Sequence, residues 1–360
     1  MSVLPALTPP PASAGPFAAF DTLRRGDPAP AWVTGSVLRA WDLDPATTTL
    51  RLVAVSENAT FRIDVGDRPL GVLRLHRPGY VADPAQIAGE LLWVQAVGTD
   101  TDVRVPDVLP TADGALVHEA RDDDGRRWFA VAFAFVDGVV LEDVVAEGSE
   151  DPAPHYALIG ATTAQLHEHV GRWTPPAGFT RFGWDLPDVL GPTSRWGDWR
   201  GAALSPADLA VLERAETAAR SVLADLPGTG PGTGLVHADL RPSNVMVGPD
   251  GRLTVIDFDD CGTSWLLWDF ASAFSFIEHE PFAPALAAAW IEGYRTVRPL
   301  TPADLRFAGA LSMVRRLQML GWTTTHREDA LPAAVWAAQV PGTAEVAARY
   351  LRTPDWLVRT

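Results

Sequence analysis

The sequence predicts an α+β fold of two lobes, a small antiparallel sheet with one helix and a larger, mainly helical lobe. Short runs of β-branched and apolar residues, separated by turns, extend from about residue 50 to residue 136. A single helical pattern interrupts them, and after residue 137 apolar residues recur mainly at helical spacing. We therefore expect a partly flexible N-terminal extension over 1–45, a sheet lobe over 46–137 and a helical lobe over 138–360.

The sheet lobe is predicted from five short apolar runs bounded by turn residues. The expected strands are residues 50–55, 60–65, 70–75, 115–120 and 128–135. The helix between the third and fourth strands begins at Asp83-Pro84, because Asp caps helix N-termini and proline fits the first turn. Gly98 is expected to end this helix.

The helical lobe contains one region of short strands within its helices. Helices are expected over 154–170 and 205–226, and three more between residues 281 and 352. Between these two groups, a short strand at 235–236 leads to a hairpin of 245–247 and 253–256.

Composition excludes several classes of protein. The 360 residues include 47% hydrophobic and 21% charged residues, as in globular chains with a real core. The net charge of −16 repels phosphate backbones, so a nucleic-acid partner is not expected. The longest apolar run, residues 128–136, is about half the roughly 20 residues that cross a bilayer, so no membrane partner is expected. Residues 1–16 lack the basic start and apolar stretch of a signal peptide.

Two residue types have unusual counts. The single cysteine, Cys261, permits no internal disulfide and fits a cytoplasmic protein. The sequence contains no lysine, so all 29 basic residues are arginine. Any role that needs a permanent side-chain cation therefore falls to arginine.

The most informative stretch is His237-Ala238-Asp239-Leu240-Arg241-Pro242-Ser243-Asn244, which follows a short strand. The predicted hairpin returns the chain, so Asp257 should end a strand close to where Asn244 begins one. The carboxylates of Asp239 and Asp257 and the amide oxygen of Asn244 are then expected to converge on a single point. Hard oxygen ligands of this kind suit Mg²⁺, which is usually coordinated by a few protein oxygens together with waters and substrate phosphates.

This stretch resembles the catalytic and metal-binding segments of the aminoglycoside phosphotransferase-like kinases, which are related to the eukaryotic protein kinases. The matching pattern is an H-x-D-x-x-x-x-N loop followed by I-D-F. The resemblance implies a bilobal protein-kinase-like fold with a nucleotide-binding sheet lobe. It also implies that Asp239 accepts the hydroxyl proton and that Asn244 and Asp257 hold Mg²⁺. Arg241 matches the lysine that faces the transferred phosphate in protein kinases, and its guanidinium suits bidentate contacts.

Two further residues of this region match supporting positions of the family. His237 corresponds to a hydrogen-bonding hub of the loop, and Asp269, in Trp268-Asp269-Phe270-Ala271, to an aspartate that braces the loop. Asp259 is expected to assist the metal. The resemblance covers about residues 50–325 and is most specific over 235–271. An ordinary turn with buried polar groups is the competing interpretation, which the ordered series of motifs disfavours.

The predicted nucleotide site in the sheet lobe rests on weaker signals. Ser56 and Asn58 lie between two strands, where kinases carry a phosphate-covering loop, but they also fit a simple hairpin turn. The region has neither G-x-G-x-x-G nor a Walker A motif, so P-loop chemistry is excluded. Arg74 occupies the strand position where the family usually has a lysine, and its guanidinium can pair with nucleotide phosphates.

Glu90 is the expected partner of Arg74, because an unpaired carboxylate within the apolar stripe of its helix would be costly. Phe133 and Phe135 precede Asp137-Gly138 and match the hinge against which adenine stacks. Aromatic residues in such segments are more often part of an ordinary core than in contact with a cofactor.

Together these matches imply Mg²⁺-dependent transfer of phosphate from ATP or GTP to a hydroxyl group. Asp269 follows Asp257 after only twelve positions, which leaves no room for a long activation segment and favours a small acceptor such as an antibiotic, amino alcohol or sugar-like molecule.

Residues 73–80 and the Glu90 helix resemble the stress-response kinase and homoserine kinase branch, so a Ser/Thr protein kinase or homoserine kinase is the alternative. Arg74 also leaves open a pseudokinase regulator. The aromatic segments 182–185 and 196–199 fit either a pocket wall or core, and oligomeric state is undetermined.

Overall fold

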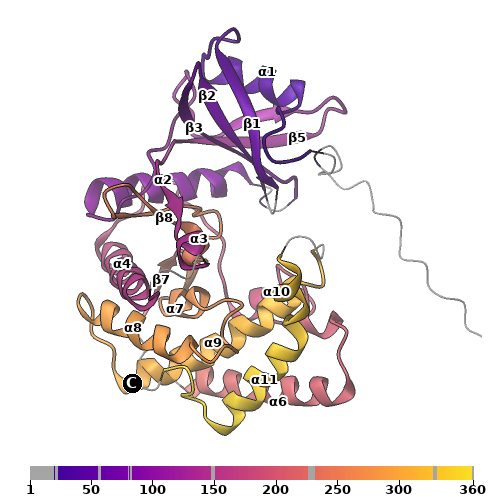
Figure 1. Ribbon diagram of the computed structural model, residues 1–360, viewed down its shortest axis with the longest axis vertical. Coiled ribbons are helices and arrows are strands. Elements are labelled where there is room, and N and C mark those ends of the chain that lie inside the picture. The colour runs from indigo at the N-terminus through magenta and orange to yellow at the C-terminus, as the bar shows by residue number, and fades with distance from the viewer. Residues whose placement is uncertain are drawn as a thin grey trace, which may run out of the picture. The chain divides into compact units, whose positions relative to one another are not determined.

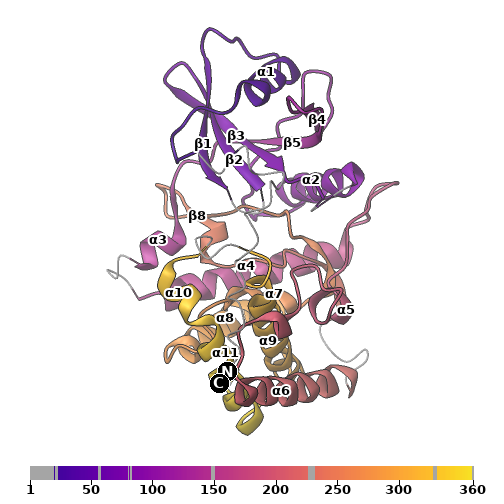
Figure 2. The same ribbon diagram turned by 90° about the vertical axis from the view of Figure 1, so that its right-hand side faces the viewer.

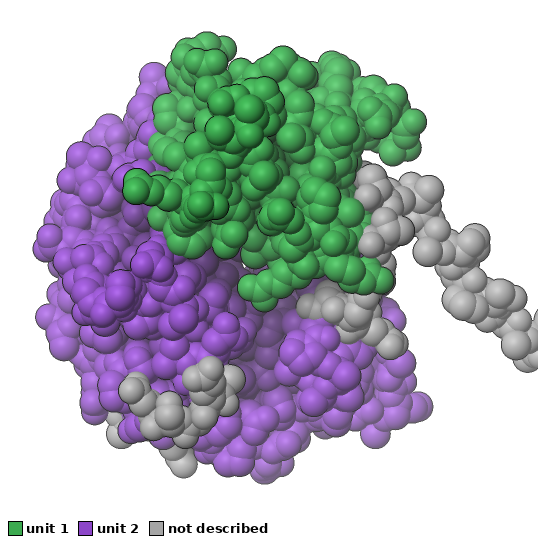
Figure 3. All heavy atoms as spheres, turned by 45° about the horizontal axis from the view of Figure 1, so that its top comes forward, with its two compact units in different colours: residues 1–88, 108–135 green, residues 89–107, 136–360 purple. Residues whose placement is uncertain are grey.

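The computed structural model describes residues 20, 23–55, 58–79, 81, 83–146, 151–225, 232–326 and 331–358 (Figure 1). The chain divides into two compact units (Figure 3). Unit 1 comprises residues 1–88 and 108–135, and unit 2 comprises residues 89–107 and 136–360. An antiparallel sheet precedes a mainly helical region, so the predicted α+β class is confirmed. The finer boundaries at residues 45 and 137 stay predictions.

Unit 1 is built on an antiparallel sheet whose strands follow the order β1-β2-β3-β5-β4. Alternate residues point to opposite faces of each strand, so Leu50 and Leu52 are buried while Arg51 between them is exposed. Phe61, Leu73 and other apolar side chains complete the core on the inner face. The strands are β1 (Thr48–Val55), β2 (Asn58–Val65), β3 (Arg68–His76), β4 (His118–Arg121) and β5 (Arg127–Ala134).

A helix lies within the segment that the sequence analysis assigned to an N-terminal extension. Helix α1 (Ala31–Ala40) buries Val33 and Val37 in the core of unit 1, and Phe20 joins the same cluster. Residue Pro28 forms an antiparallel bridge with Arg51 of β1. Part of the extension therefore belongs to the sheet unit.

Helix α2 (Pro84–Asp100) begins at the predicted proline but continues past Gly98, which the sequence analysis took as its end. A Cβ atom at position 98 would approach Val105 Cγ2 to 3.1 Å. The glycine therefore gives room for the chain that returns beside the helix, rather than ending the helix.

Unit 2 contains the remaining helices and two small antiparallel sheets, β6-β8-β9 and β10-β7. The predicted strand and hairpin near residue 240 correspond to β7 (Thr233–Val236), β8 (Val245–Val247) and β9 (Leu253–Val255), and β6 (Val139–Val140) and β10 (Gly262–Trp265) are additional strands. The helices are α3 (Leu141–Ala146), α4 (Ala153–Arg172), α5 (Leu186–Val189), α6 (Pro206–Asp225), α7 (Trp268–Ala273), α8 (Ala283–Arg295), α9 (Pro302–Trp322), α10 (Ala333–Ala337) and α11 (Gln339–Arg352).

Two close helix contacts organise unit 2. Helices α4 and α8 approach through glycines, because a Cβ at Gly160 would collide with the Trp290 carbonyl oxygen and one at Gly293 with that of Ala157. Helix α9 begins at a capping box of Thr301 and Asp304 and packs against α6, α7 and α11 (Figure 2). The helix is buried over most of its length, so every polar side chain on it needs a partner.

Candidate active site

The loop between β7 and β8 carries the predicted catalytic residue in a constrained backbone. Ala238 has a φ of 68° and Asp257, after β9, a φ of 62°. Such values are uncommon for residues with a Cβ and cost free energy that surrounding contacts must offset. The hairpin brings the two segments together, since the Ile256 N–H donates to the Asn244 carbonyl oxygen over 3.0 Å.

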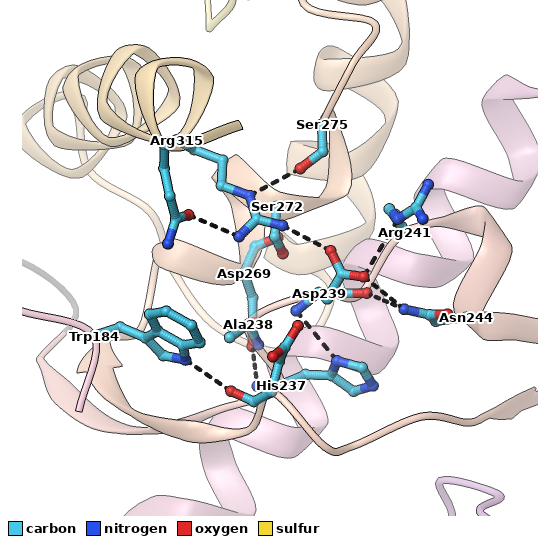
Figure 4. Close-up of polar contacts among 12 residues, drawn as sticks. Trp184, His237, Ala238, Asp239, Arg241, Asn244, Asp269, Ser272, Ser275 and Arg315 are labelled. Carbon is cyan, nitrogen blue, oxygen red and sulfur yellow. Dashed lines mark hydrogen bonds and ion pairs between the residues drawn. The ribbon is translucent and has the colours of Figure 1, made fainter. Parts of the chain in front are cut away.

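The Asp239 carboxylate is surrounded by donors (Figure 4). Its Oδ1 accepts from a terminal nitrogen of Arg315 at 2.7 Å. Its Oδ2 accepts from Asn244 Nδ2 at 2.8 Å and from Arg241 Nε at 3.3 Å. The side chain is 17% exposed, so the carboxylate is oriented by the protein yet still reaches the surface.

Arg241 is the more accessible of the two arginines beside Asp239. Its side chain is 25% exposed, and a terminal nitrogen lies 3.7 Å from a carboxylate oxygen of Glu142. Its guanidinium also lies 5.5 Å from the ring centre of Phe276, a residue whose φ is 76°. Arg241 therefore places a positive charge at the open side of the catalytic loop.

Asp269 holds the backbone on which Asp239 is mounted. Its Oδ2 accepts from the His237 N–H at 3.1 Å and its Oδ1 from the Ala238 N–H at 2.7 Å. The carboxylate is fully buried, so these bonds act in a medium of low dielectric constant. The strained φ at Ala238 is thus fixed by two charge-assisted hydrogen bonds.

His237 links the catalytic loop to the segment before Asp257. The Asp239 N–H donates to His237 Nδ1 at 3.3 Å, and His237 Nε2 lies 3.1 Å from the Ile256 carbonyl oxygen. This pair of partners requires the neutral tautomer that carries its hydrogen on Nε2. The structure therefore brings together His237, Asp239, Asn244 and Asp269, whose functional roles stay predictions.

The predicted metal ligands have a donor set that fits a hard divalent cation. Asn244 Nδ2 is engaged by both the carbonyl and the carboxylate of Asp239, which leaves its Oδ1 as the ligand atom. Asp257 is exposed, whereas Asp259 is buried. Within the described ranges, no group of three or more His, Cys, Asp or Glu side chains forms a complete protein cage. The chemistry of Asn244 and Asp257 therefore suits a divalent cation, and their roles as its ligands stay predictions.

The sequence-predicted nucleotide residues lie mostly on the sheet of unit 1. Asn58 begins β2, and Arg74 on β3 is buried with its guanidinium 5.3 Å from the Phe133 ring centre. Phe135 follows β5, and its N–H donates to the Leu70 carbonyl oxygen. The Arg74–Phe133 contact is the cation–π geometry expected of a strand arginine beside an aromatic ring.

The nucleotide-binding roles of all these residues stay predictions. Ser56 lies outside the described residues. Glu90 is fully buried on α2 within unit 2, whereas Arg74 belongs to unit 1, and the Arg74–Glu90 pair stays a prediction.

The aromatic side chains of segments 182–185 and 196–199 belong to the core. Phe182, Trp184, Trp196 and Trp199 are all buried. Trp184 Nε1 donates to the Asp260 carbonyl oxygen at 2.7 Å, and Arg181 donates to the carbonyl oxygens of Asp259 and Cys261. These side chains therefore fix the backbone that follows Asp257.

Arg315 is the residue of this site that the sequence analysis missed. It lies on α9, is 1% exposed and contacts Asp239 from 76 positions away in the chain. Burial lowers the pKa of Arg315, and the neighbouring Asp239 carboxylate opposes that shift. An arginine remains charged at neutral pH despite such a shift. The available signal was the pair Arg315-Arg316 within the largely apolar stretch 307–322 of the helix, because buried cations need anionic partners.

Comparison with known proteins identifies the family. Residues 49–300 match the model of the phosphotransferase enzyme family, abbreviated APH. The chain belongs to this family. The predicted resemblance is therefore confirmed, and the protein is a small-molecule kinase with an alcohol group as acceptor. Family membership implies a nucleoside triphosphate and a divalent metal.

Similar proteins extend over most of the chain. The structure of a microcompartment-associated aminopropanol kinase superimposes with a TM-score of 0.77 and 36% identity, covering 90% of this chain and 98% of that one. An uncharacterized protein of Deinococcus radiodurans is 31% identical over 300 residues, 81% of each chain. A homoserine kinase of Rhodospirillum rubrum is 28% identical over 290 residues, 79% of this chain and 80% of that one.

Across the described residues, none of the helices combines the length and the apolar character that crossing a membrane requires.

Proposed function

We propose that the protein transfers the γ-phosphoryl group of ATP to the hydroxyl of a small hydroxylated amine, with Mg²⁺ as its metal. The single observation that carries the proposal is the donor arrangement around Asp239, which leaves an oriented carboxylate at the surface of unit 2. The choice of acceptor is supported by the similarity to an aminopropanol kinase and a homoserine kinase. Both names denote acceptors with an amine and a hydroxyl.

In the proposed mechanism the acceptor oxygen attacks the γ-phosphorus, its proton passes to Asp239, and the bond to the β-phosphate oxygen breaks. Asp239 orients the hydroxyl and receives its proton. Arg241 lies beside Asp239 and offsets charge that develops on the transferred group. Asn244 and Asp257 would hold the divalent metal, which would supply positive charge to neutralise the phosphate oxygens.

Homoserine itself is the second candidate, because its named kinases are relatives over most of the chain. A peptide acceptor is disfavoured by the short connection after Asp257, since β10 begins at Gly262 and α7 at Trp268. An extended groove for a peptide would need a longer segment at this place.

The test measures nucleotide consumption with a panel of acceptors: aminopropanol, homoserine, choline, an aminoglycoside and an unstructured protein. Wild type should turn over a hydroxylated amine with MgATP, and parallel reactions with GTP establish the nucleotide preference. Asp239→Asn should lose turnover by at least about 10²-fold while it still binds nucleotide. Asp102→Asn, a change at an exposed residue of unit 2 that is not part of the loop, is the matched control. Equal rates for wild type and Asp239→Asn with every acceptor would refute the proposal.

A further inference from the structure

Arg315 is a buried cation whose position on α9 calls for a functional explanation. Its side chain is 1% exposed, and its neighbours on the helix include Val314 and Leu317. Removing a guanidinium from water costs several kcal/mol, and replacing a buried ion pair by apolar residues is often neutral or stabilising. Stability alone therefore does not account for an arginine here.

The guanidinium of Arg315 is held in one orientation by three acceptors. Its terminal nitrogens donate to Asp239 Oδ1 at 2.7 Å and to Gln318 Oε1 at 2.9 Å, and its Nε donates to Ser275 Oγ at 2.9 Å. Its central carbon lies 5.0 Å from the Trp196 ring centre and 5.9 Å from that of Trp268. Ser275 and Gln318 are neutral, so the contact with Asp239 is the charged one. The rigid, planar guanidinium is therefore held by Ser275 and Gln318, and it in turn fixes the position of the Asp239 carboxylate.

The hydrogen bonds of Asp239 leave little capacity for further donors. An ionised carboxylate offers about four lone-pair positions. Asn244 and Arg241 both donate to Oδ2, whereas Arg315 is the donor to Oδ1. By this count, one acceptor position remains, and it lies on the same oxygen that Arg315 holds.

We propose that Arg315 is a positioning residue, which fixes the rotamer of Asp239 so that the remaining lone pair on Oδ1 points at the acceptor hydroxyl. This inference rests on the proposed function, in which Asp239 receives the hydroxyl proton. Arg315 acts through Asp239 and does not itself reach the acceptor, because it is buried. Its removal should therefore impair phosphoryl transfer more than the binding of nucleotide or acceptor.

The neighbouring residue, Arg316, provides a matched control on the same helix. It is fully buried and pairs with Glu278 at 2.8 Å, and its Nε donates to Thr343 Oγ1. Replacing either arginine by methionine removes one buried charge from α9 and leaves a shorter, unbranched apolar side chain in its place. Only the change at position 315 removes a donor from Asp239. Because Arg316→Met leaves the Glu278 carboxylate buried and unpaired, the control is made as Arg316→Met with Glu278→Gln.

The experiment compares kcat, KM for ATP and KM for the preferred acceptor in wild type, Arg315→Met and the Arg316→Met/Glu278→Gln control. Arg315→Met should lower kcat by about 10²-fold with KM for ATP changed less than about threefold, since misplacing a reacting group by about 1 Å has such an effect. The control should keep a kcat within about threefold of wild type, whatever its melting temperature. The inference would be overturned if kcat of Arg315→Met equalled that of wild type, or if the control lost as much kcat as Arg315→Met.

Two further measurements separate positioning from loss of the fold. The double variant Arg315→Met/Asp239→Asn should be no slower than Asp239→Asn alone, because both changes act on one step. If the loss of kcat in the double variant equalled the product of the two single losses, Arg315 would act independently of Asp239, and this would also overturn the inference. Arg315→Ala should regain at least about tenfold in kcat when guanidinium ion at tens of millimolar occupies the vacated space between the two tryptophans. If Arg315→Met does not fold, Arg315→Lys and the rescued Arg315→Ala decide the question by the same comparison.

The outcome also separates this inference from the proposed function. Full activity in Asp239→Asn would refute the role of the carboxylate itself. A loss in Asp239→Asn with full activity in Arg315→Met would leave the proposed function standing and refute the role of Arg315.

Discussion

The imidazole of His167 on α4 lies with Nε2 3.1 Å from Asp269 Oδ2, and both side chains are fully buried. On its other side, His167 Nδ1 lies 2.9 Å from the hydroxyl of Tyr294 on α8. Asp269 in turn accepts from the backbone N–H groups of His237 and Ala238. A continuous line of hydrogen bonds therefore connects two packed helices with the backbone of the catalytic loop.

The first prediction concerns Asp269. Asp269→Asn keeps the size of the side chain but replaces one acceptor oxygen by a donor, so one buried N–H group of the loop loses its partner. We expect a loss of about 2–4 kcal/mol in the free energy of unfolding, measured by urea denaturation, and a lower kcat. Asp102→Asn, an exposed change in the same unit, should alter neither quantity. A variant as stable as wild type would show that the loop does not depend on Asp269.

The second prediction concerns pH. Burial lowers the pKa of His167, and the bond to Asp269 opposes this shift without reversing it. The folded state thus keeps His167 neutral while the unfolded chain takes up a proton below about pH 6.5. Stability contributed by the neutral imidazole is present above that pH and is lost as pH falls, by up to about 1.4 kcal/mol per pH unit.

His167→Gln removes this proton uptake while the side chain can still donate to Asp269. The decrease in the free energy of unfolding between pH 7 and pH 5 should therefore be smaller in the variant. His118, His169 and His279 also have lowered pKa values because of burial, so they contribute to the total slope in both proteins. Identical slopes in variant and wild type would contradict the assignment to His167.

The third prediction concerns the contact between α4 and α8. A Cβ atom at Gly293 would collide with the carbonyl oxygen of Ala157, and a backbone atom cannot rotate away. Gly293→Ala should lower the free energy of unfolding by about 1–3 kcal/mol despite the better helix propensity of alanine. Gly171 on α4 provides the control, because a Cβ atom there would meet nothing within 4 Å beyond its own helix. Gly171→Ala should therefore be neutral or stabilising by up to about 1 kcal/mol. In thermal melts, Gly293→Ala should unfold at a lower temperature than wild type and Gly171→Ala at the same or a higher temperature; an unchanged melting temperature in Gly293→Ala would contradict the prediction.

The fourth prediction concerns the metal. Asn244→Ala removes both the amide oxygen proposed as a ligand and the Nδ2 donor to Asp239. We expect the Mg²⁺ concentration for half-maximal activity to rise at least about tenfold, together with a lower kcat. A titration with MgCl₂ at fixed ATP provides the measurement. An unchanged Mg²⁺ requirement would assign the metal to other groups.

The sequence was most informative where chemistry is local. Asp239 and Asn244 are five positions apart on one loop, and the turn between β8 and β9 brings Ile256 back to Asn244. Their proximity could therefore be predicted from spacing and turn residues alone. The helix start at Pro84 was predictable for the same reason, because caps are encoded within a few residues.

The missed features depend on contacts between distant segments. Arg315 reaches Asp239 only because α9 packs beside α7, and nothing near Asp239 in the sequence indicates that partner. Helix α1 follows Pro30, which provides no side-chain cap, and its buried face is short. The contacts of His167 with Asp269 and Tyr294 likewise depend on how α4 packs against distant segments.

The paired arginines of α9 have one more consequence. Consecutive residues of an α-helix differ by about 100° in direction around its axis. Arg315 and Arg316 satisfy separate acids, Asp239 and Glu278, in these two directions. The two ion pairs together fix the rotation of α9 about its own axis. A rotation of the helix that improved one ion pair would break the other.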